Sequence, residues 1–104
     1  MALKTTLWDV TKYLQSDEDI ATYIEAAFED GDPRVIAAAL GDVARARGMT
    51  SVAKEAGVTR EALYHSLTET GDPRLSTVIG VMKALGVRLK AEVVADEAVA
   101  QETA

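Results

Sequence analysis

Apolar residues recur along most of this chain at the three- and four-residue spacing of amphipathic helices. The first such stretch predicts a helix over residues 17–29, because Ser16 and Asp19 form a capping-box-like start. Its apolar stripe consists of Ile20, Tyr23, Ile24, Ala27 and Phe28. The preceding segment is too apolar for a loose tail, and we expect it to pack on the domain as a short turn or extended piece.

The tetrapeptide Gly-Asp-Pro-Arg occurs twice, at residues 31–34 and 71–74, each time before a helical pattern. In both copies the aspartate can cap a helix while proline occupies the first turn, where its missing N–H costs nothing. The predicted helices cover residues 33–47 and 73–85. The inward positions of the first are Val35, Ile36, Ala39, Leu40, Val43 and Ala44. Those of the second are Leu75, Val78, Ile79, Met82 and Leu85.

Two shorter helices are predicted between these, over residues 50–56 and 60–69. Ala53 is small enough for two helices to cross closely. Gly57 stands where the chain leaves the first helix and needs a positive φ angle, and Thr59 suits the N-cap of the second. This ordered combination indicates a helix-turn-helix, the motif that lays a short recognition helix in the DNA major groove. A plain helical hairpin is the alternative.

The second of these short helices is amphipathic. Leu63 and Leu67 lie four residues apart and predict one side that faces the core. The other side carries groups that can form hydrogen bonds, namely Arg60, Glu61, Tyr64 and His65.

The last regular pattern, over residues 87–94, alternates apolar and charged residues and predicts a short β-strand. An isolated strand leaves its backbone donors and acceptors unpaired. We therefore expect it to pair with the same strand of a second copy, as in a homodimer, or with the sheet edge of a partner protein. The positions expected at this dimer strand are Val87, Leu89, Ala91 and Val93. A frayed extension of the preceding helix is the alternative.

Composition excludes several classes of protein. The 104 residues support one small domain, and the lack of cysteine excludes disulfides and thiolate chemistry. No apolar run reaches the roughly 20 residues of a membrane span, and the N-terminus lacks the pattern of a signal peptide. We therefore expect a cytoplasmic protein without a membrane partner. One histidine and no nucleophile–base pair predict no enzyme, no catalytic residues, no metal site and no cofactor.

The net charge of −6 is unevenly distributed. Residues 1–32 hold two basic and eight acidic side chains, residues 33–94 hold nine basic and six acidic ones, and residues 95–104 hold three acidic ones. We divide the chain accordingly into an acidic extension with one helix, a helix-turn-helix domain ending in a strand, and a disordered acidic tail. The basic part coincides with the helix-turn-helix, as phosphate contact requires. The acidic part suits a basic protein partner, or is a solvated helix face.

Several runs of this chain resemble a known family. Residues 49–67, with the proline-started helix and Ala-Leu-Gly-Val at 84–87, resemble the lambda-repressor-like, Xre-type DNA-binding domain. Residues 8–89 more closely resemble the antidote proteins of HigA-like addiction modules, most specifically through Ala-Ala-Leu-Gly-Asp-Val-Ala-Arg-Ala-Arg-Gly-Met at 38–49. Ser51 departs from the glutamine of many Xre-type domains, and Ser66 stands where an apolar residue is common.

The resemblance implies an all-α fold: a five-helix lambda-repressor-like domain with an N-terminal helical extension and a short C-terminal β-strand. It also implies two linked functions. The protein would bind and neutralise a small basic toxin, typically an mRNA-cleaving enzyme encoded beside it, and would repress their shared promoter by binding operator DNA. The alternatives are a stand-alone prophage-type repressor and an interaction module that sequesters a toxin without binding DNA.

Specific contacts can be assigned to residues of the helix-turn-helix. Arg60 can grip guanine O6 and N7, and Glu61 can accept a hydrogen bond from cytosine N4. Alternatively, Arg60 pairs with an acid and Glu61 only favours the helix dipole. Tyr64 and His65 lie one turn further on, within reach of phosphate or, for His65, a base edge; packing on its helix is the alternative for Tyr64. The candidates for phosphate contact are Thr50, Ser51, Lys54 and Thr59.

Toxin contact is harder to assign from the sequence. Trp8, Tyr13 and Leu14 resemble an aromatic anchor set of the kind that dominates interfaces, or they pack on the protein's own core. Asp17, with the two acids that follow it, can steer a basic toxin or only cap its helix.

Overall fold

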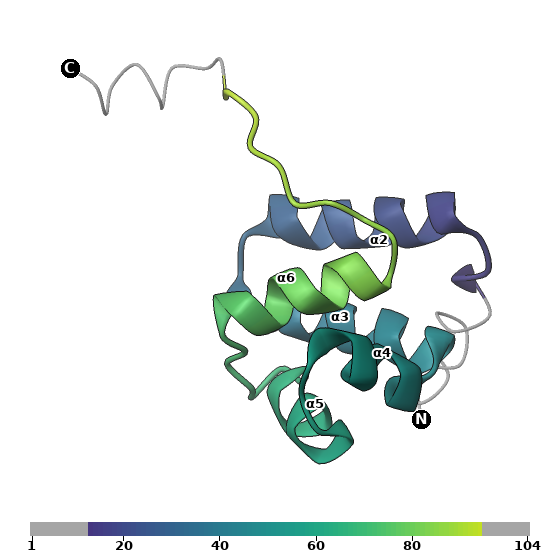
Figure 1. Cartoon of the computed structure of the whole chain (residues 1–104). Coiled ribbons are helices and arrows are strands. Elements are labelled where there is room, and N and C mark those ends of the chain that lie inside the picture. Colours follow the sequence, from purple (N-terminus) through teal and green to yellow (C-terminus); the bar gives the residue numbers. More distant parts are fainter. Residues whose placement is uncertain (1–12, 95–104) are drawn as a thin grey trace, which may run out of the picture.

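The computed structural model describes residues 13–94, which form five α-helices and no regular strand (Figure 1). Their bounds are Asp17–Asp30 for α2, Pro33–Arg47 for α3, Met49–Ala56 for α4, Arg60–Ser66 for α5 and Leu75–Ala84 for α6. The predicted all-α class is confirmed for this part of the chain. No helix within it is long and apolar enough to cross a bilayer.

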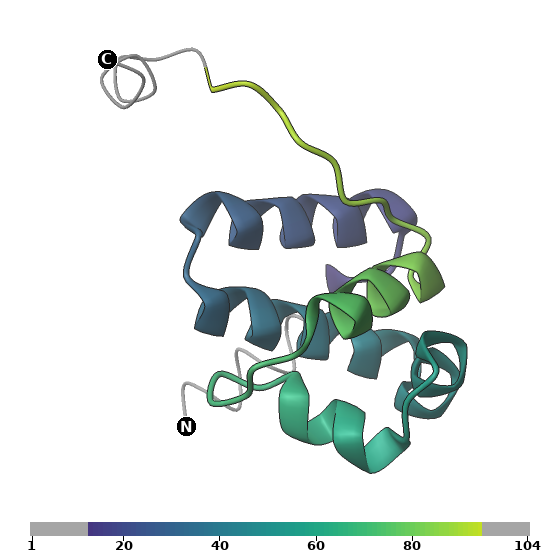
Figure 2. The same ribbon diagram turned by 60° about the vertical axis from the view of Figure 1, so that its left-hand side comes forward.

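Helices α2 and α3 form a hairpin joined by a two-residue connection (Figures 1 and 2). The Ser16 hydroxyl accepts a hydrogen bond from the Asp19 N–H at 3.1 Å and caps α2, as predicted. Gly31 ends that helix in the left-handed conformation. Asp32 then caps α3 by accepting from the Arg34 N–H at 2.9 Å, and Pro33 is the first residue of α3, also as predicted.

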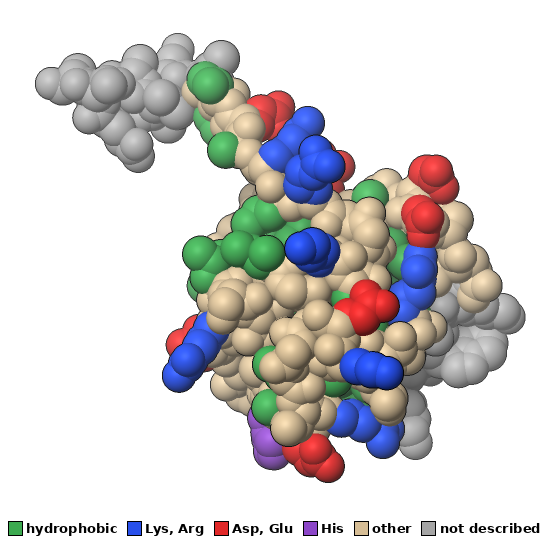
Figure 3. Space-filling model, in the orientation of Figure 1, with side chains coloured by type: hydrophobic (Ala, Val, Ile, Leu, Met, Phe, Trp, Pro, Cys, Tyr) green, Lys and Arg blue, Asp and Glu red, His purple; other side chains and the backbone are tan. Residues whose placement is uncertain are grey.

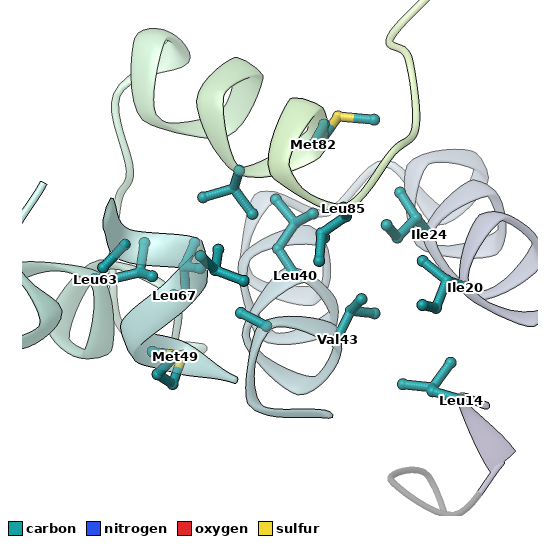
Figure 4. Close-up of a cluster of buried hydrophobic side chains, with 14 residues drawn as sticks. Leu14, Ile20, Ile24, Leu40, Val43, Met49, Leu63, Leu67, Met82 and Leu85 are labelled. Atoms are coloured by element: carbon teal, nitrogen blue, oxygen red, sulfur yellow. The ribbon is translucent and has the colours of Figure 1, made fainter. Parts of the chain in front are cut away.

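The core gathers side chains from all five helices (Figure 4). The largest side chains that are almost completely buried are Ile20, Leu40, Val43, Leu63, Leu67, Val81 and Leu85. Burial of each large aliphatic side chain contributes about 2 kcal/mol, so this cluster is the main source of stability. Two glycines let helices approach: a Cβ at Gly41 would lie 2.2 Å from the Leu67 carbonyl oxygen, and one at Gly80 would lie 3.1 Å from the Ala56 Cα.

Two predicted helix boundaries are wrong. The helix predicted to reach residue 69 ends at Ser66, because the chain turns there: the Thr68 hydroxyl donates to the His65 carbonyl and the Gly71 N–H to the Thr68 carbonyl. The helix predicted to begin at residue 73 begins at Leu75, with Arg74 as a cap that has no side-chain hydrogen bond. The non-helical link of residues 67–74 lets the chain pass from α5 to α6.

Three residues predicted to face inward are instead exposed, namely Val35, Leu75 and Ile79. In α6 the inward face is rotated relative to the prediction, so that Val81 is buried beside Met82 and Leu85. In α3 the first turn lies at the edge of the hairpin, and Ala37 is buried where Val35 is not. Leu75 and Ile79 of α6 therefore remain on the surface.

Residues 87–94 follow α6 and extend away from the helical body (Figures 1 and 2). Leu89, Val93 and Val94 are exposed along this segment. In the single chain it carries no regular strand, so the predicted β-strand stays a prediction.

Candidate functional site

The turn between α4 and α5 has the local geometry that its sequence predicts. Gly57 adopts φ +77°, and its N–H donates to the last turn of α4. The Val58 N–H donates to the Ala53 carbonyl at 3.1 Å, and the Val58 side chain is half-buried against the core. The Thr59 hydroxyl accepts from the Ala62 N–H at 3.0 Å and caps α5. These bonds fix the direction in which α5 leaves α4.

Leucines anchor α5 to the body of the protein. Leu63 and Leu67 are both buried and lie in the same cluster as Met49 of α4 (Figure 4). Leu67 takes the core position at the end of the helix, while Ser66 is half-buried with its hydroxyl 3.4 Å from the Leu63 carbonyl. With one side held by these contacts, the opposite side of α5 faces solvent.

All eight residues predicted to contact DNA are exposed. They are Thr50, Ser51 and Lys54 on α4, Thr59 in the turn, and Arg60, Glu61, Tyr64 and His65 on α5. In the space-filling view, basic, acidic and histidine side chains lie together at the lower end, where α5 lies (Figure 3). These exposed side chains offer hydrogen-bond donors and acceptors along α4, the turn and α5.

Arg60 has an arrangement that suits base contact. Its guanidinium carbon lies 5.4 Å from the centre of the Tyr64 ring, a cation–π distance. Stacking of this kind orients the planar guanidinium while leaving its N–H groups free to donate. Within residues 13–94, Arg60 forms no ion pair, so the alternative of pairing with an acid of its own chain is absent there.

Two arginines near the end of α3, Arg45 and Arg47, are held in ion pairs. Arg45 pairs with Asp42, with 2.6 Å between Nη2 and Oδ1. Arg47 pairs with Asp17, thirty residues away. The neighbouring carboxylate partly neutralises each arginine and so weakens its attraction for a phosphate.

The residues predicted to contact a toxin are divided by the structure. Tyr13 is exposed, whereas Leu14 is buried in the core (Figure 4). For Leu14 this burial favours the alternative of packing on the protein's own core. Asp17 is exposed and holds Arg47. Trp8 lies outside the described residues.

The residues predicted for a dimer strand lie along the segment that leaves α6. Val87 is half-buried, while Leu89, Ala91 and Val93 are exposed. Grooves flank this segment on two sides, one lined by Ile79 and Met82 and the other by residues of α2.

One polar network was not predicted. The Tyr23 hydroxyl donates to Asp42 Oδ2 at 2.7 Å, and Arg45 occupies the other carboxylate oxygen. Burial raises the pKa of Tyr23 well above its usual range, and the hydrogen bond to Asp42 raises it further. The sequence feature that could have indicated this network is Asp42, an acid within the apolar stretch of α3 that stands three residues before Arg45. Tyr23 was predicted on the apolar stripe of its helix, and its half-buried ring fits that position.

Comparisons with known proteins identify a family for this chain. Residues 4–93 match the model of a family described as "Probable addiction module antidote protein". A protein of Haemophilus influenzae (strain ATCC 51907 / DSM 11121 / KW20 / Rd), described as an uncharacterized protein, is 41% identical over 85 residues, which are 82% of this chain and 88% of that protein. No solved structure gives a significant match.

Proposed function

Because the chain belongs to the family of probable addiction module antidote proteins, we propose that it is an antitoxin that neutralises a small, basic, mRNA-cleaving toxin. The match covers residues 4–93 and carries this proposal. An antidote implies a toxin as its partner and a regulatory rather than an enzymatic role. A toxin that cleaves mRNA would place both proteins in the cytoplasm.

The toxin test is direct. Expression of the protein encoded by the adjacent reading frame should arrest growth, and co-expression of this chain should restore it. The two proteins should also co-purify as a complex. Growth arrest that this chain does not relieve would contradict the antitoxin function.

We further propose that the protein represses the promoter of its own module by inserting α5 into the major groove of operator DNA. The supporting observation is that Leu63 and Leu67 hold one side of α5 in the core while Arg60, Glu61 and His65 are exposed on the other. Arg60 would read guanine, a contact worth about 1–3 kcal/mol of discrimination. The residues of α4 and Thr59 would position the helix on the phosphates.

Operator binding is tested with Arg60→Ala in a gel-shift titration. The variant should bind about tenfold to a hundredfold more weakly and with relaxed specificity at one position. Arg34→Ala, which removes a positive charge from an exposed position of α3 away from the proposed DNA contacts, is the control and should bind nearly as the wild type does. Wild-type affinity should fall as salt rises. Equal operator affinity for Arg60→Ala and wild type would rule out α5 as the readout helix.

Operator DNA with two-fold symmetry calls for a dimer, and we propose that residues 87–94 pair with their copy in a second chain. The exposed apolar side chains of this segment, Leu89 and Val93, support this, as do the exposed Leu75 and Ile79 of α6. In sedimentation, Leu89→Asp with Val93→Asp should yield a monomer. The same measurement on Leu75→Asp shows whether the exposed face of α6 also contributes to the dimer interface.

The overall charge of −6 favours a second candidate, an interaction module that sequesters the toxin without binding DNA. It predicts a stable complex with the toxin and no salt-sensitive binding to the promoter. The gel-shift titration distinguishes the two proposals.

A further inference from the structure

We propose that an open groove on the α2–α3 hairpin is the surface that receives the toxin, and that its occupant is a cationic segment of that toxin. The inference rests on the proposed antitoxin function and adds the binding surface. The groove lies between α2, α3 and the loop after α5, and has a volume of about 780 Å³. We call it the hairpin groove.

The floor of the hairpin groove is apolar and built from small side chains. Four alanines and one valine contribute to it: Ala26, Ala27, Val35, Ala38 and Ala39. Short side chains on two adjacent helices leave room above the backbone, which a partner's side chains can fill. Val35 has 40% of its surface exposed here, although its position in the sequence predicted burial. An exposed apolar side chain in a hollow gains free energy when a partner covers it.

The rim of the hairpin groove is acidic. Four carboxylates line it, from Asp30, Asp32, Asp42 and Glu69, against the single cation of Arg34. Arg34 is held by Asp32 at 3.2 Å.

The remaining carboxylates differ in what they already contact. Asp42 is engaged by the Tyr23 hydroxyl and by Arg45. Within residues 13–94, neither Asp30 nor Glu69 forms an ion pair. Asp30 accepts one hydrogen bond, from the Asp32 N–H at 3.2 Å. Among the residues that the structure describes, these two acids therefore remain available to a cation of a partner.

An apolar floor with an acidic rim is complementary to lysine and arginine side chains. Their aliphatic stems cover apolar surface while the charged ends reach carboxylates. Acidic groups around such a surface also speed the encounter with a basic partner. The same charge repels DNA phosphates, and no residue proposed for DNA contact lines the hairpin groove. Toxin and operator would thus bind to different residues of the protein.

The test is a pair of charge reversals with a matched control. Asp30→Lys with Glu69→Lys reverses the two unpaired acids of the rim. Glu25→Lys with Glu55→Lys changes the net charge by the same amount at exposed positions that do not line the hairpin groove. Affinity for the purified product of the adjacent reading frame is measured by titration calorimetry on the full-length chain. The rim variant should lose at least tenfold in affinity, and the control should stay within about threefold of the wild type.

A second variant, Ala26→Arg, fills the hairpin groove from an exposed position of α2 and leaves the hydrogen bonds of the rim acids in place. It should also weaken toxin binding at least tenfold, and it serves as the test if the double reversal unfolds the protein. Thermal unfolding of each variant checks that the fold is kept.

The possible outcomes separate the groove from the antitoxin function. If the wild type binds the toxin and a folded groove variant binds it equally well, the groove inference is wrong while the antitoxin function stands. If the control loses as much affinity as the rim variant, net charge alone governs binding and the groove inference is again wrong. If the wild type does not bind the toxin, the proposed function fails and the inference fails with it.

Discussion

The same four residues, Gly-Asp-Pro-Arg, adopt two different structures in this protein. At residues 31–34 they form a compact link in which Gly31 ends α2 and Asp32 caps α3. At residues 71–74 they remain non-helical, and α6 begins one residue later. Both copies nevertheless contribute to the hairpin groove, the first through Asp32 and Arg34 and the second through Gly71.

The first residues of the two copies, Gly31 and Gly71, are needed for different structural reasons. Gly31 has φ +83° and no atom within 4 Å of where a Cβ would lie, so it is required for its backbone conformation. At Gly71 a Cβ would lie 2.2 Å from the Ser66 carbonyl oxygen, so this residue is required for a close approach. A local sequence therefore sets which conformations are possible, and the chain that precedes it selects one of them.

The largest effect is expected from Gly71→Ala. The new methyl group would overlap backbone atoms of Ser66 and His65, which cannot move without shifting the end of α5. Overpacking of this kind costs about 3 kcal/mol of unfolding free energy. Urea denaturation measures the loss, and operator affinity should fall with it because α5 moves. A variant as stable as the wild type would show that the approach at this turn is looser than described.

Gly31→Ala should have a smaller effect. Space is available for the methyl group, and the cost is that of placing an L-residue in the left-handed region, about 1 kcal/mol. The same urea experiment measures it. The comparison between the two copies fails if this substitution destabilises the protein more than the one at Gly71.

The aspartates should also behave differently. Asp32→Ala removes the oxygen that accepts from the Arg34 N–H and should lower the melting temperature. Asp72→Ala is the matched control, because Asp72 does not cap α6, and its melting temperature should match that of the wild type. An equal drop in both variants would indicate that the cap is not the source of the effect.

The smallest expected effect is in the acid limb of the pH–stability profile. Hydrogen bonds from the Arg34 side chain, and then from its backbone N–H, lower the pKa of Asp32. Since the folded pKa is below the unfolded value of about 3.9, this contribution is present above that pH and is lost as the pH falls through the folded pKa. Subtracting the profile of Asp32→Ala from that of the wild type should isolate it, and a difference that does not change below pH 4 would contradict the assignment.

Much of the candidate DNA surface could be predicted from the sequence, because it depends on local rules. Thr59 caps its helix through a hydrogen bond three residues away, and Gly57 supplies the positive φ that the turn needs. The spacing of Leu63 and Leu67 by itself placed both beneath α5. The roles of the exposed residues in binding DNA remain predictions.

The tertiary structure decided the features that depend on partners distant in the sequence. It turned Leu75 and Ile79 outward and joined Arg47 to Asp17 across thirty residues. It also formed the hairpin groove, whose acids come from two helices and two connecting segments. Periodicity specifies which side of a helix is apolar, but the neighbouring helices and their close approaches determine how much of that side is covered. That coverage is fixed only when the whole chain packs.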